Sequence, residues 1–130
     1  MSINETSQKS ESEPTDCSKS LSLAELRLAN VFRNEEWFKG ERVFIPLSFR
    51  ATELAGETGE ACNEIKKLER TNLGLVGGKE SLDDLADELA DVMISVDLIA
   101  MDLGIDLSES IARKFNKTSD KHGMGTRIVR

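Results

Sequence analysis

The sequence is short of the residues on which several classes of protein depend: it has one histidine, two cysteines, one tryptophan and no tyrosine. Two cysteines without a Cys-x-x-Cys pair provide neither a disulfide framework nor a Cys-x-x-Cys site. Aromatic residues make up 5% of the chain, and sandwiches or barrels of β-strands normally use more. No apolar run reaches the roughly 18 residues of a membrane span, and the N-terminus is not basic and then apolar, as a secretory signal is. We therefore expect no membrane association and a cytoplasmic location.

The net charge of the chain further limits the kinds of ligand that it can bind. The formal net charge is −7 and the pI is near 4.8, so the chain lacks the basic footprint of a nucleic-acid-binding protein, whereas it can host cations. A length of 130 residues suits one domain with a modest core. We expect a disordered polar N-terminal tail over residues 1–20, a helical domain over residues 21–123 and a C-terminal tail over residues 124–130.

Periodicity predicts four helices, over residues 22–34, 46–70, 81–103 and 106–121. Ser22 and Glu25 form a capping-box pattern at the first, and apolar residues recur at steps of three and four along the second and third. The third predicted helix is apolar nearly all round from Val92 to Leu103, and a single short domain cannot easily bury so much apolar surface. The sequence therefore predicts an all-α protein, a four-helix bundle assembled as a homo-oligomer, most simply a two-fold dimer and alternatively a tetramer.

Two pairs of acids without basic neighbours are the main chemical signal. Glu57 and Glu60 share a face of the second predicted helix, Glu88 and Asp91 share a face of the third, and none of them has a lysine or arginine three or four residues away. If the two helices pack antiparallel, both pairs converge. Four hard oxygen donors suit Mg²⁺, with Mn²⁺ as a substitute, and Mg²⁺ held by carboxylates leaves positions for substrate phosphates.

Two plainer interpretations stay open at this point. The first is that charge runs on helices are often faces exposed to solvent. The second is a di-iron bundle, which also uses acids. A di-iron bundle requires Glu-x-x-His pairs, however, and His122 has no glutamate at that spacing. Asp97 stands inside the apolar part of the third helix, where a buried carboxylate needs a partner. That partner is either an ion pair or helix cap across the bundle, or a substrate or metal.

The chain resembles the MazG-like, all-α nucleoside triphosphate pyrophosphohydrolases. The resemblance covers roughly residues 23–123 and includes their ExxE…ExxD signature, here Glu57-x-x-Glu60 and Glu88-x-x-Asp91. The supporting segments read SFRATELAGETGEACNEIKKLER, LADELADVMISVDLIAMDLGIDL and ARKFNKTSDKHG. The resemblance implies hydrolysis of a (deoxy)nucleoside triphosphate to the monophosphate and pyrophosphate, with a house-cleaning role in the nucleotide pool.

Roles for single residues follow from the resemblance. Glu57, Glu60, Glu88 and Asp91 would hold Mg²⁺, and one of the glutamates, or a metal-bound water that it orients, would activate the nucleophile. Glu64 is a further candidate ligand or base, and Glu53 a weaker one.

The substrate-binding candidates lie elsewhere in the chain. Relatives hold phosphates with basic residues of the last helix, which here are Lys114, Lys117 and Lys121. Trp37 is a candidate for stacking on the nucleobase or for anchoring the core, and Asn30 for reading a base edge.

Many relatives carry Lys, Asn and Arg along the last helix where this chain has Lys114, Thr118 and Lys121. A lysine lacks the fork of an arginine, so a catalytically silent nucleotide-binding or regulatory module stays open as an alternative. A plain helical oligomerisation protein is a third. For an enzyme, we expect the active site in a cleft between the second, third and fourth helices.

Overall fold

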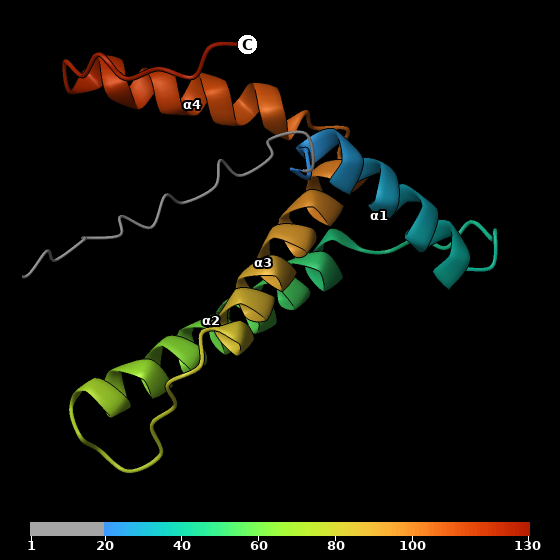
Figure 1. The fold of residues 1–130 in the computed structure, drawn as a ribbon. Helices are drawn as coiled ribbons and strands as arrows, with labels where there is room; N and C mark the ends of the chain where they lie inside the picture. The colour runs from blue at the N-terminus through green and yellow to red at the C-terminus, as the bar shows by residue number, and fades with distance from the viewer. Residues whose placement is uncertain (1–19) are drawn as a thin grey trace, which may run out of the picture.

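The computed structural model describes residues 20–130, so the predicted N-terminal tail lies outside the described residues except for Ser20. Residues 20–130 form four helices and no strand, namely α1 (Leu23–Trp37), α2 (Leu47–Asn72), α3 (Asp83–Asp102) and α4 (Leu107–Lys121) (Figure 1). The all-α prediction is confirmed, with helix ends close to the predicted ones. None of these four helices has the combination of length and apolar character that crossing a bilayer would require.

Local sequence explains where the helices begin and end. Ser22 and Glu25 form the predicted capping box at α1, each side chain accepting from the other's backbone N–H. Asp106 caps α4 by accepting a hydrogen bond from Glu109 N–H. Gly104 follows α3 with a φ of +65°, a backbone conformation that favours glycine.

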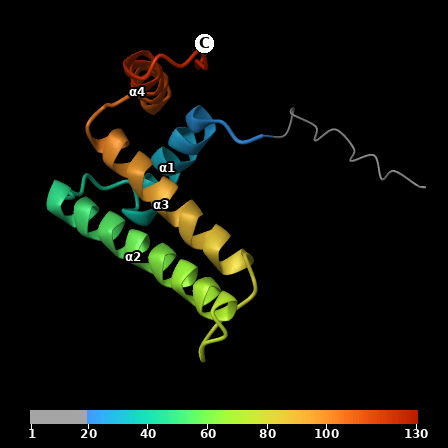
Figure 2. The ribbon, with the colours of Figure 1, turned by 90° about the vertical axis from the view of Figure 1, so that its left-hand side faces the viewer.

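Helices α2 and α3 lie side by side and antiparallel (Figure 2). The loop between them folds back onto the end of α2, where Lys79 N–H donates to Lys67 O at 3.1 Å. Gly78 allows this close approach, because a Cβ there would lie 2.7 Å from Thr71 N. The Lys79 side chain then pairs with Asp84 of α3. The loop therefore fixes the register in which the two acid-bearing helices face one another.

Helix α1 docks on α3 through a polar cluster. Asp97, only 1% exposed, accepts from Arg27 Nε and from Asn30 Nδ2, both at 2.9 Å. The partner of Asp97 is therefore the ion pair across the bundle, and not a substrate or a metal.

Arg50 joins three helices from its buried position on α2. Its guanidinium donates to Asp102 of α3 at 2.9 Å, to Asn34 of α1 at 3.1 Å and to Glu53 at 3.4 Å. Polar contacts therefore hold much of the interior, as each buried charge requires a partner.

The apolar core is small by comparison. Among residues 20–130 the buried apolar side chains are Ala61, Ala100 and Ala112. Larger apolar side chains of α3 stay partly open to solvent in the single chain, as Met93 is 45% exposed and Leu103 54%. The burial predicted for residues 92–103 is therefore incomplete in one chain, and the homo-oligomer stays a prediction.

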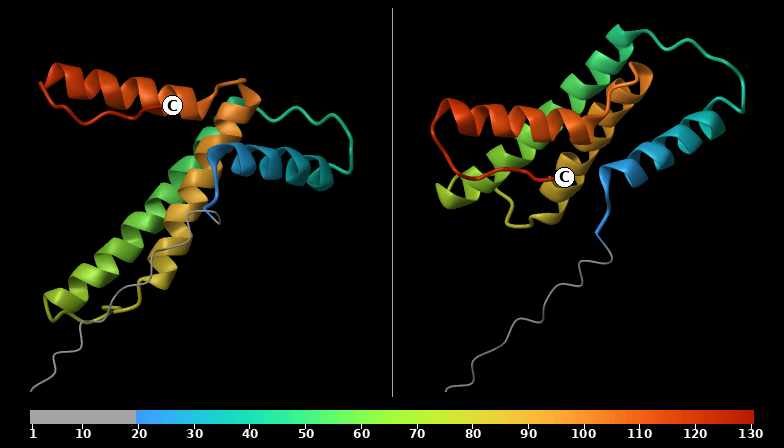
Figure 3. Two further views of the ribbon diagram at one scale, coloured as in Figure 1. Left: turned by 45° about the horizontal axis from the view of Figure 1, so that its top comes forward. Right: turned by 90° about the horizontal axis from the view of Figure 1, so that it is seen from above.

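Helix α4 projects away from the α2–α3 pair, and its main contacts are with α1 (Figures 1 and 3). The C-terminal residues return along α4, where the Asn116 side chain forms two hydrogen bonds with the backbone of Ile128, at 2.9 and 3.0 Å. In the single chain the bundle therefore consists of α1, α2 and α3, and α4 forms a separate arm.

Candidate active site

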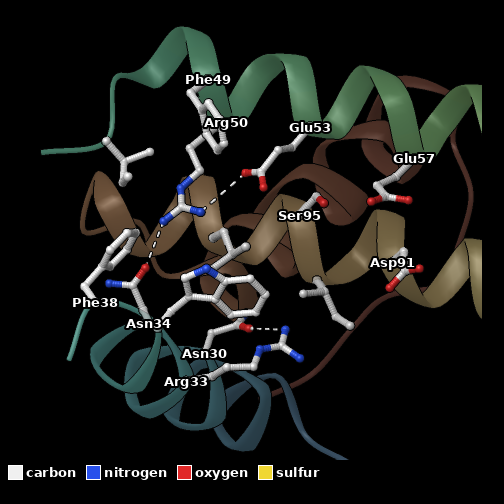
Figure 4. Close-up of a pocket in the computed structure, with 14 residues that line it drawn as sticks. Asn30, Arg33, Asn34, Phe38, Phe49, Arg50, Glu53, Glu57, Asp91 and Ser95 are labelled. Carbon is white, nitrogen blue, oxygen red and sulfur yellow. Dashed lines mark hydrogen bonds and ion pairs between the residues drawn. The ribbon is translucent and has the colours of Figure 1, made fainter. Parts of the chain in front are cut away.

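Three carboxylates from α2 and α3 form a compact cluster. One oxygen from each of Glu57, Glu88 and Asp91 lies within 4.8 Å of the other two. Glu88 and Asp91 share a face because they are three residues apart on a helix, and the antiparallel packing sets Glu57 opposite them. Figure 4 shows Glu57 on α2 and Asp91 on α3, on facing sides of the two helices.

Glu88 is the most constrained member. Its Oε2 atom is shielded from solvent and has no hydrogen-bond partner among the described residues. The pKa of Glu88 is raised above its usual value, first by desolvation, then by the neighbouring Glu60 carboxyl and by repulsion from Asp91 and Glu57. Glu60, itself exposed, thus lies at the edge of the cluster.

The pKa of Glu57 is raised as well, first by desolvation and then by repulsion from Asp91, Glu60 and Glu53. Neither raised carboxyl has a basic partner within reach in the described chain. A buried acceptor without a donor, inside a set of hard oxygen ligands, fits a divalent cation such as Mg²⁺ or Mn²⁺.

These pKa shifts predict how Mg²⁺ changes stability with pH. Folding raises the pKa of Glu57 and Glu88, so their contribution to the stability of the metal-free protein is present below the usual carboxyl pKa and is lost as the pH rises through the raised values. Mg²⁺ competes with those protons. We expect Mg²⁺ to raise the thermal midpoint by several degrees near pH 7.5 and to have no effect near pH 4.

Thermal unfolding at both pH values, with KCl at matched ionic strength as the control, measures this difference. A Mg²⁺ effect of equal size at both pH values would instead indicate general screening of surface charge.

Two of the weaker metal candidates are already neutralised. Glu64 is 8% exposed and pairs with Lys67 and, at 4.0 Å, with Lys79, so its pKa is lowered, chiefly by the hydrogen bond from Lys67. Glu53 pairs with Arg50 at 3.4 Å. The structure thus leaves both outside the three-carboxylate cluster, and Glu64 contributes to the anchoring of the loop.

A cavity of about 430 Å³ opens beside the cluster (Figure 4). Such a volume falls within the usual range for small-ligand sites. Glu53, Glu57 and Asp91 line its acidic end. The remaining lining residues of α1, α2, α3 and the α1–α2 link are Asn30, Arg33, Asn34, Trp37, Phe38, Ile45, Phe49, Arg50, Ile94, Ser95 and Leu98. The cavity therefore joins an anionic end, suited to a cation, to a largely apolar end that can take a flat ring.

The predicted substrate-binding residues divide between this cavity and α4. Trp37 lines the cavity and is 77% exposed, whereas Asn30 lines it while only 1% exposed. Three lysines lie on α4 and none of them lines the cavity; they are Lys114, Lys117 and Lys121. In the single chain the cavity is lined by α1, α2, α3 and the α1–α2 link, so α4 is absent from it and the cleft predicted between the second, third and fourth helices stays a prediction.

Sequence reasoning missed several cavity residues, among them Arg33, Asn34 and Phe49. A signal for two of them was present, because Asn30, Arg33, Asn34 and Trp37 follow one another at steps of three, one and three, which places them on one face of α1. Nothing in that spacing says that the face borders a cavity.

The comparison with known families supplies the remaining observation. The profile of the MazG nucleotide pyrophosphohydrolase domain matches residues 48–125, more than half of the chain. The chain belongs to this family. It is also similar to the Gene 37 protein of Mycobacterium phage L5, 38% identical over 79 residues that cover 61% of this chain and 68% of that protein. No solved structure matches the chain significantly.

The region that matches the MazG profile includes both acid pairs and all of α3 and α4. It begins one residue after the start of α2, so α1 lies outside it. The family assignment therefore applies to the acidic end of the cavity and not to the side that α1 contributes.

Proposed function

We propose that the protein is a metal-dependent nucleoside triphosphate pyrophosphohydrolase, which converts a (d)NTP to the monophosphate and pyrophosphate and serves nucleotide-pool house-cleaning. The observation that carries the proposal is the three-carboxylate cluster, with its unpartnered Glu88 Oε2, at one end of a cavity of about 430 Å³. Membership of the MazG family supports the same reaction.

The reaction adds water across the α–β phosphoanhydride bond. Glu57, Glu88 and Asp91, with Glu60 beside them, would hold Mg²⁺, which when bound neutralises phosphate charge and makes water more acidic. Through that ion, the carboxylates of this chain would hold the triphosphate at the acidic end, and the apolar lining would keep the base out of water. One of the glutamates of the cluster would accept the proton of the attacking water or orient that water.

The test is an incubation of the purified chain with canonical and modified NTPs and dNTPs, with and without Mg²⁺, followed by detection of both products. Mg²⁺-dependent release of monophosphate and pyrophosphate in equal amounts is expected. Release of orthophosphate would contradict the reaction class. No turnover across the panel by a folded protein that still binds Mg²⁺ would favour the alternative, a catalytically silent nucleotide-binding or regulatory module. That alternative is supported by Thr118 in the last helix, where many relatives carry an asparagine.

We further propose a homo-oligomer, a dimer or a tetramer, in which the α4 lysines of one copy serve the cavity of another. The support is that α4 projects from the bundle while Ile111 and Phe115 on it are 41% and 43% exposed. A second copy of this chain would cover these side chains and bring positive charge to a site whose own lining is acidic at the phosphate end.

Mixing two inactive variants measures this sharing. A chain with Lys114→Ala, Lys117→Ala and Lys121→Ala retains its own carboxylates, and an Asp91→Asn chain retains its own lysines. Co-refolded, they are expected to regain a quarter or so of wild-type activity, because about that share of sites would combine an intact part from each. The control is Asp91→Asn mixed with itself. Failure to regain activity in a verified mixed oligomer would contradict a shared site.

A further inference from the structure

Arg33 is an unusual lining residue of the cavity. Within residues 20–130 its guanidinium forms no ion pair, and its hydrogen bond goes from Nη2 to Asn30 Oδ1 at 3.3 Å (Figure 4). Arg50, the other arginine of the lining, donates instead to three protein acceptors. A guanidinium has five N–H donors, so Arg33 keeps four of them for a ligand, whereas Arg50 keeps two.

The hydrogen-bond partner of Arg33, which is itself exposed, belongs to a buried pair. Asp97 accepts the amide N–H of Asn30 at Oδ2, so the amide oxygen of Asn30 turns toward Arg33. Asp97 is itself fixed by Arg27 at 2.9 Å, and both Asp97 and Asn30 are 1% exposed. The buried pair therefore fixes the acceptor that orients one Nη2 N–H of Arg33 and leaves its other donors open to a ligand.

The neighbouring polar residue adds another donor. Asn34 Oδ1 accepts from Arg50 Nη2 at 3.1 Å, so the amide N–H groups of Asn34 are left for the cavity. The α1 side of the cavity, between its aromatic residues, thus presents hydrogen-bond donors to whatever ring binds there.

We propose that Arg33 reads the base, and that the substrates are nucleoside triphosphates of a 6-oxopurine, guanine or hypoxanthine. This inference rests on the proposed function. A 6-oxopurine presents two adjacent acceptors, O6 and N7, which match the arginine fork, whereas adenine replaces O6 with an amino donor. Cytosine also has two adjacent acceptors, but its O2 lies beside the sugar, which crowds the approach. Because α1 lies outside the part that matches the MazG profile, this contact belongs to this chain's own base pocket.

Binding is measured first, because it does not depend on catalysis. Trp37 is the only tryptophan of the chain and lines the cavity, so its fluorescence reports occupancy. Titrations with dGMP, dIMP, dAMP, dCMP and 7-deaza-dGMP are made on the full chain with Mg²⁺. We expect dGMP and dIMP to bind about tenfold more tightly than dAMP, and 7-deaza-dGMP, which lacks N7, to lose most of that advantage.

The Arg33→Gln variant then tests the assignment. It should bring dGMP and 7-deaza-dGMP to similar affinities and abolish or reverse the preference for dGMP over dAMP, and for dGTP over dATP in kcat/KM, because a glutamine amide can pair with N6 and N7 of adenine. Arg42→Gln, in the α1–α2 link and outside the cavity lining, is the matched control and should leave every ratio unchanged.

Several results would overturn the assignment. An equal loss for all nucleotides in Arg33→Gln would assign Arg33 to phosphate or sugar, and an Arg33-dependent preference for dCMP would assign it to cytosine. Wild-type binding of dAMP as tight as that of dGMP would also refute it. If guanine selectivity appears in binding while no nucleotide is hydrolysed, the base assignment stands and the proposed hydrolysis fails.

Discussion

Replacing Glu88 with glutamine should reduce kcat/KM for the preferred nucleotide by about 10³-fold or more. The substitution removes one of the three clustered carboxylates and leaves the shape of the side chain unchanged. Losing a charged ligand from a catalytic cation is expected to cost several kcal/mol of transition-state stabilisation, and each 1.4 kcal/mol corresponds to a factor of ten. Steady-state assays of pyrophosphate release at saturating Mg²⁺ measure the loss.

The same variant should show the opposite effect on stability. Repulsion and desolvation at Glu88 oppose folding of the metal-free chain, so Glu88→Gln should melt at the same temperature as wild type or higher without Mg²⁺, and gain less from Mg²⁺. Asp87→Asn is the matched control, since it removes one charge from the adjacent exposed position and leaves the cluster intact. Activity of Glu88→Gln within threefold of wild type would contradict a role for the cluster in the reaction.

Asp97→Ala should cost about 3–5 kcal/mol of unfolding free energy, as expected when one partner of a buried ion pair is removed. The carboxylate is 1% exposed and accepts from two side chains, so its removal leaves the buried Asn30 amide without its partner and frees Arg27 from the ion pair. Urea unfolding followed by circular dichroism gives the difference.

Asp120→Ala is the comparison that isolates burial. Asp120 also pairs with an arginine, Arg127, but its side chain is 59% exposed, so a loss below about 1 kcal/mol is expected. Asp97→Asn should fall between the two, because an amide oxygen can still accept one of the hydrogen bonds. Equal losses at Asp97 and Asp120 would contradict the structural role given to the buried pair.

Local sequence patterns were enough to predict the helices and three of the four acids expected to converge, whereas the fourth, Glu60, is not part of the three-carboxylate cluster. Ser22, Glu25 and Asp106 mark helix starts through their own side chains, and a helix of 3.6 residues per turn places Glu88 and Asp91 on one face in any fold. The absence of basic neighbours on the same helix predicted uncompensated acids, and the raised pKa values of Glu57 and Glu88 agree.

Long-range partners were not predictable in this way. The pairs Arg27–Asp97 and Arg50–Asp102 join residues 70 and 52 positions apart, and helical periodicity says which face is apolar without saying which helix covers it. That is why α4 was expected at the cleft that α1 in fact borders. Lys67 lies three residues after Glu64 on the same helix, so this ion pair could be predicted from the sequence. The second partner of Glu64, Lys79, comes from the α2–α3 loop and could not.

Ala61 shows how the small side chains of the core affect the distance between α2 and α3. It is 5% exposed on α2, next to Glu60, and α3 is the helix that packs along α2. A methyl group at this position lets the two helices approach closely, and their separation sets how far apart Glu57 and the two acids of α3 lie. Mg²⁺ takes oxygens at about 2.0–2.1 Å and Ca²⁺ at about 2.3–2.6 Å. In the proposed metal site, the size of this one buried side chain would therefore bear on ion selectivity, since a valine here would widen the gap in favour of the larger cation.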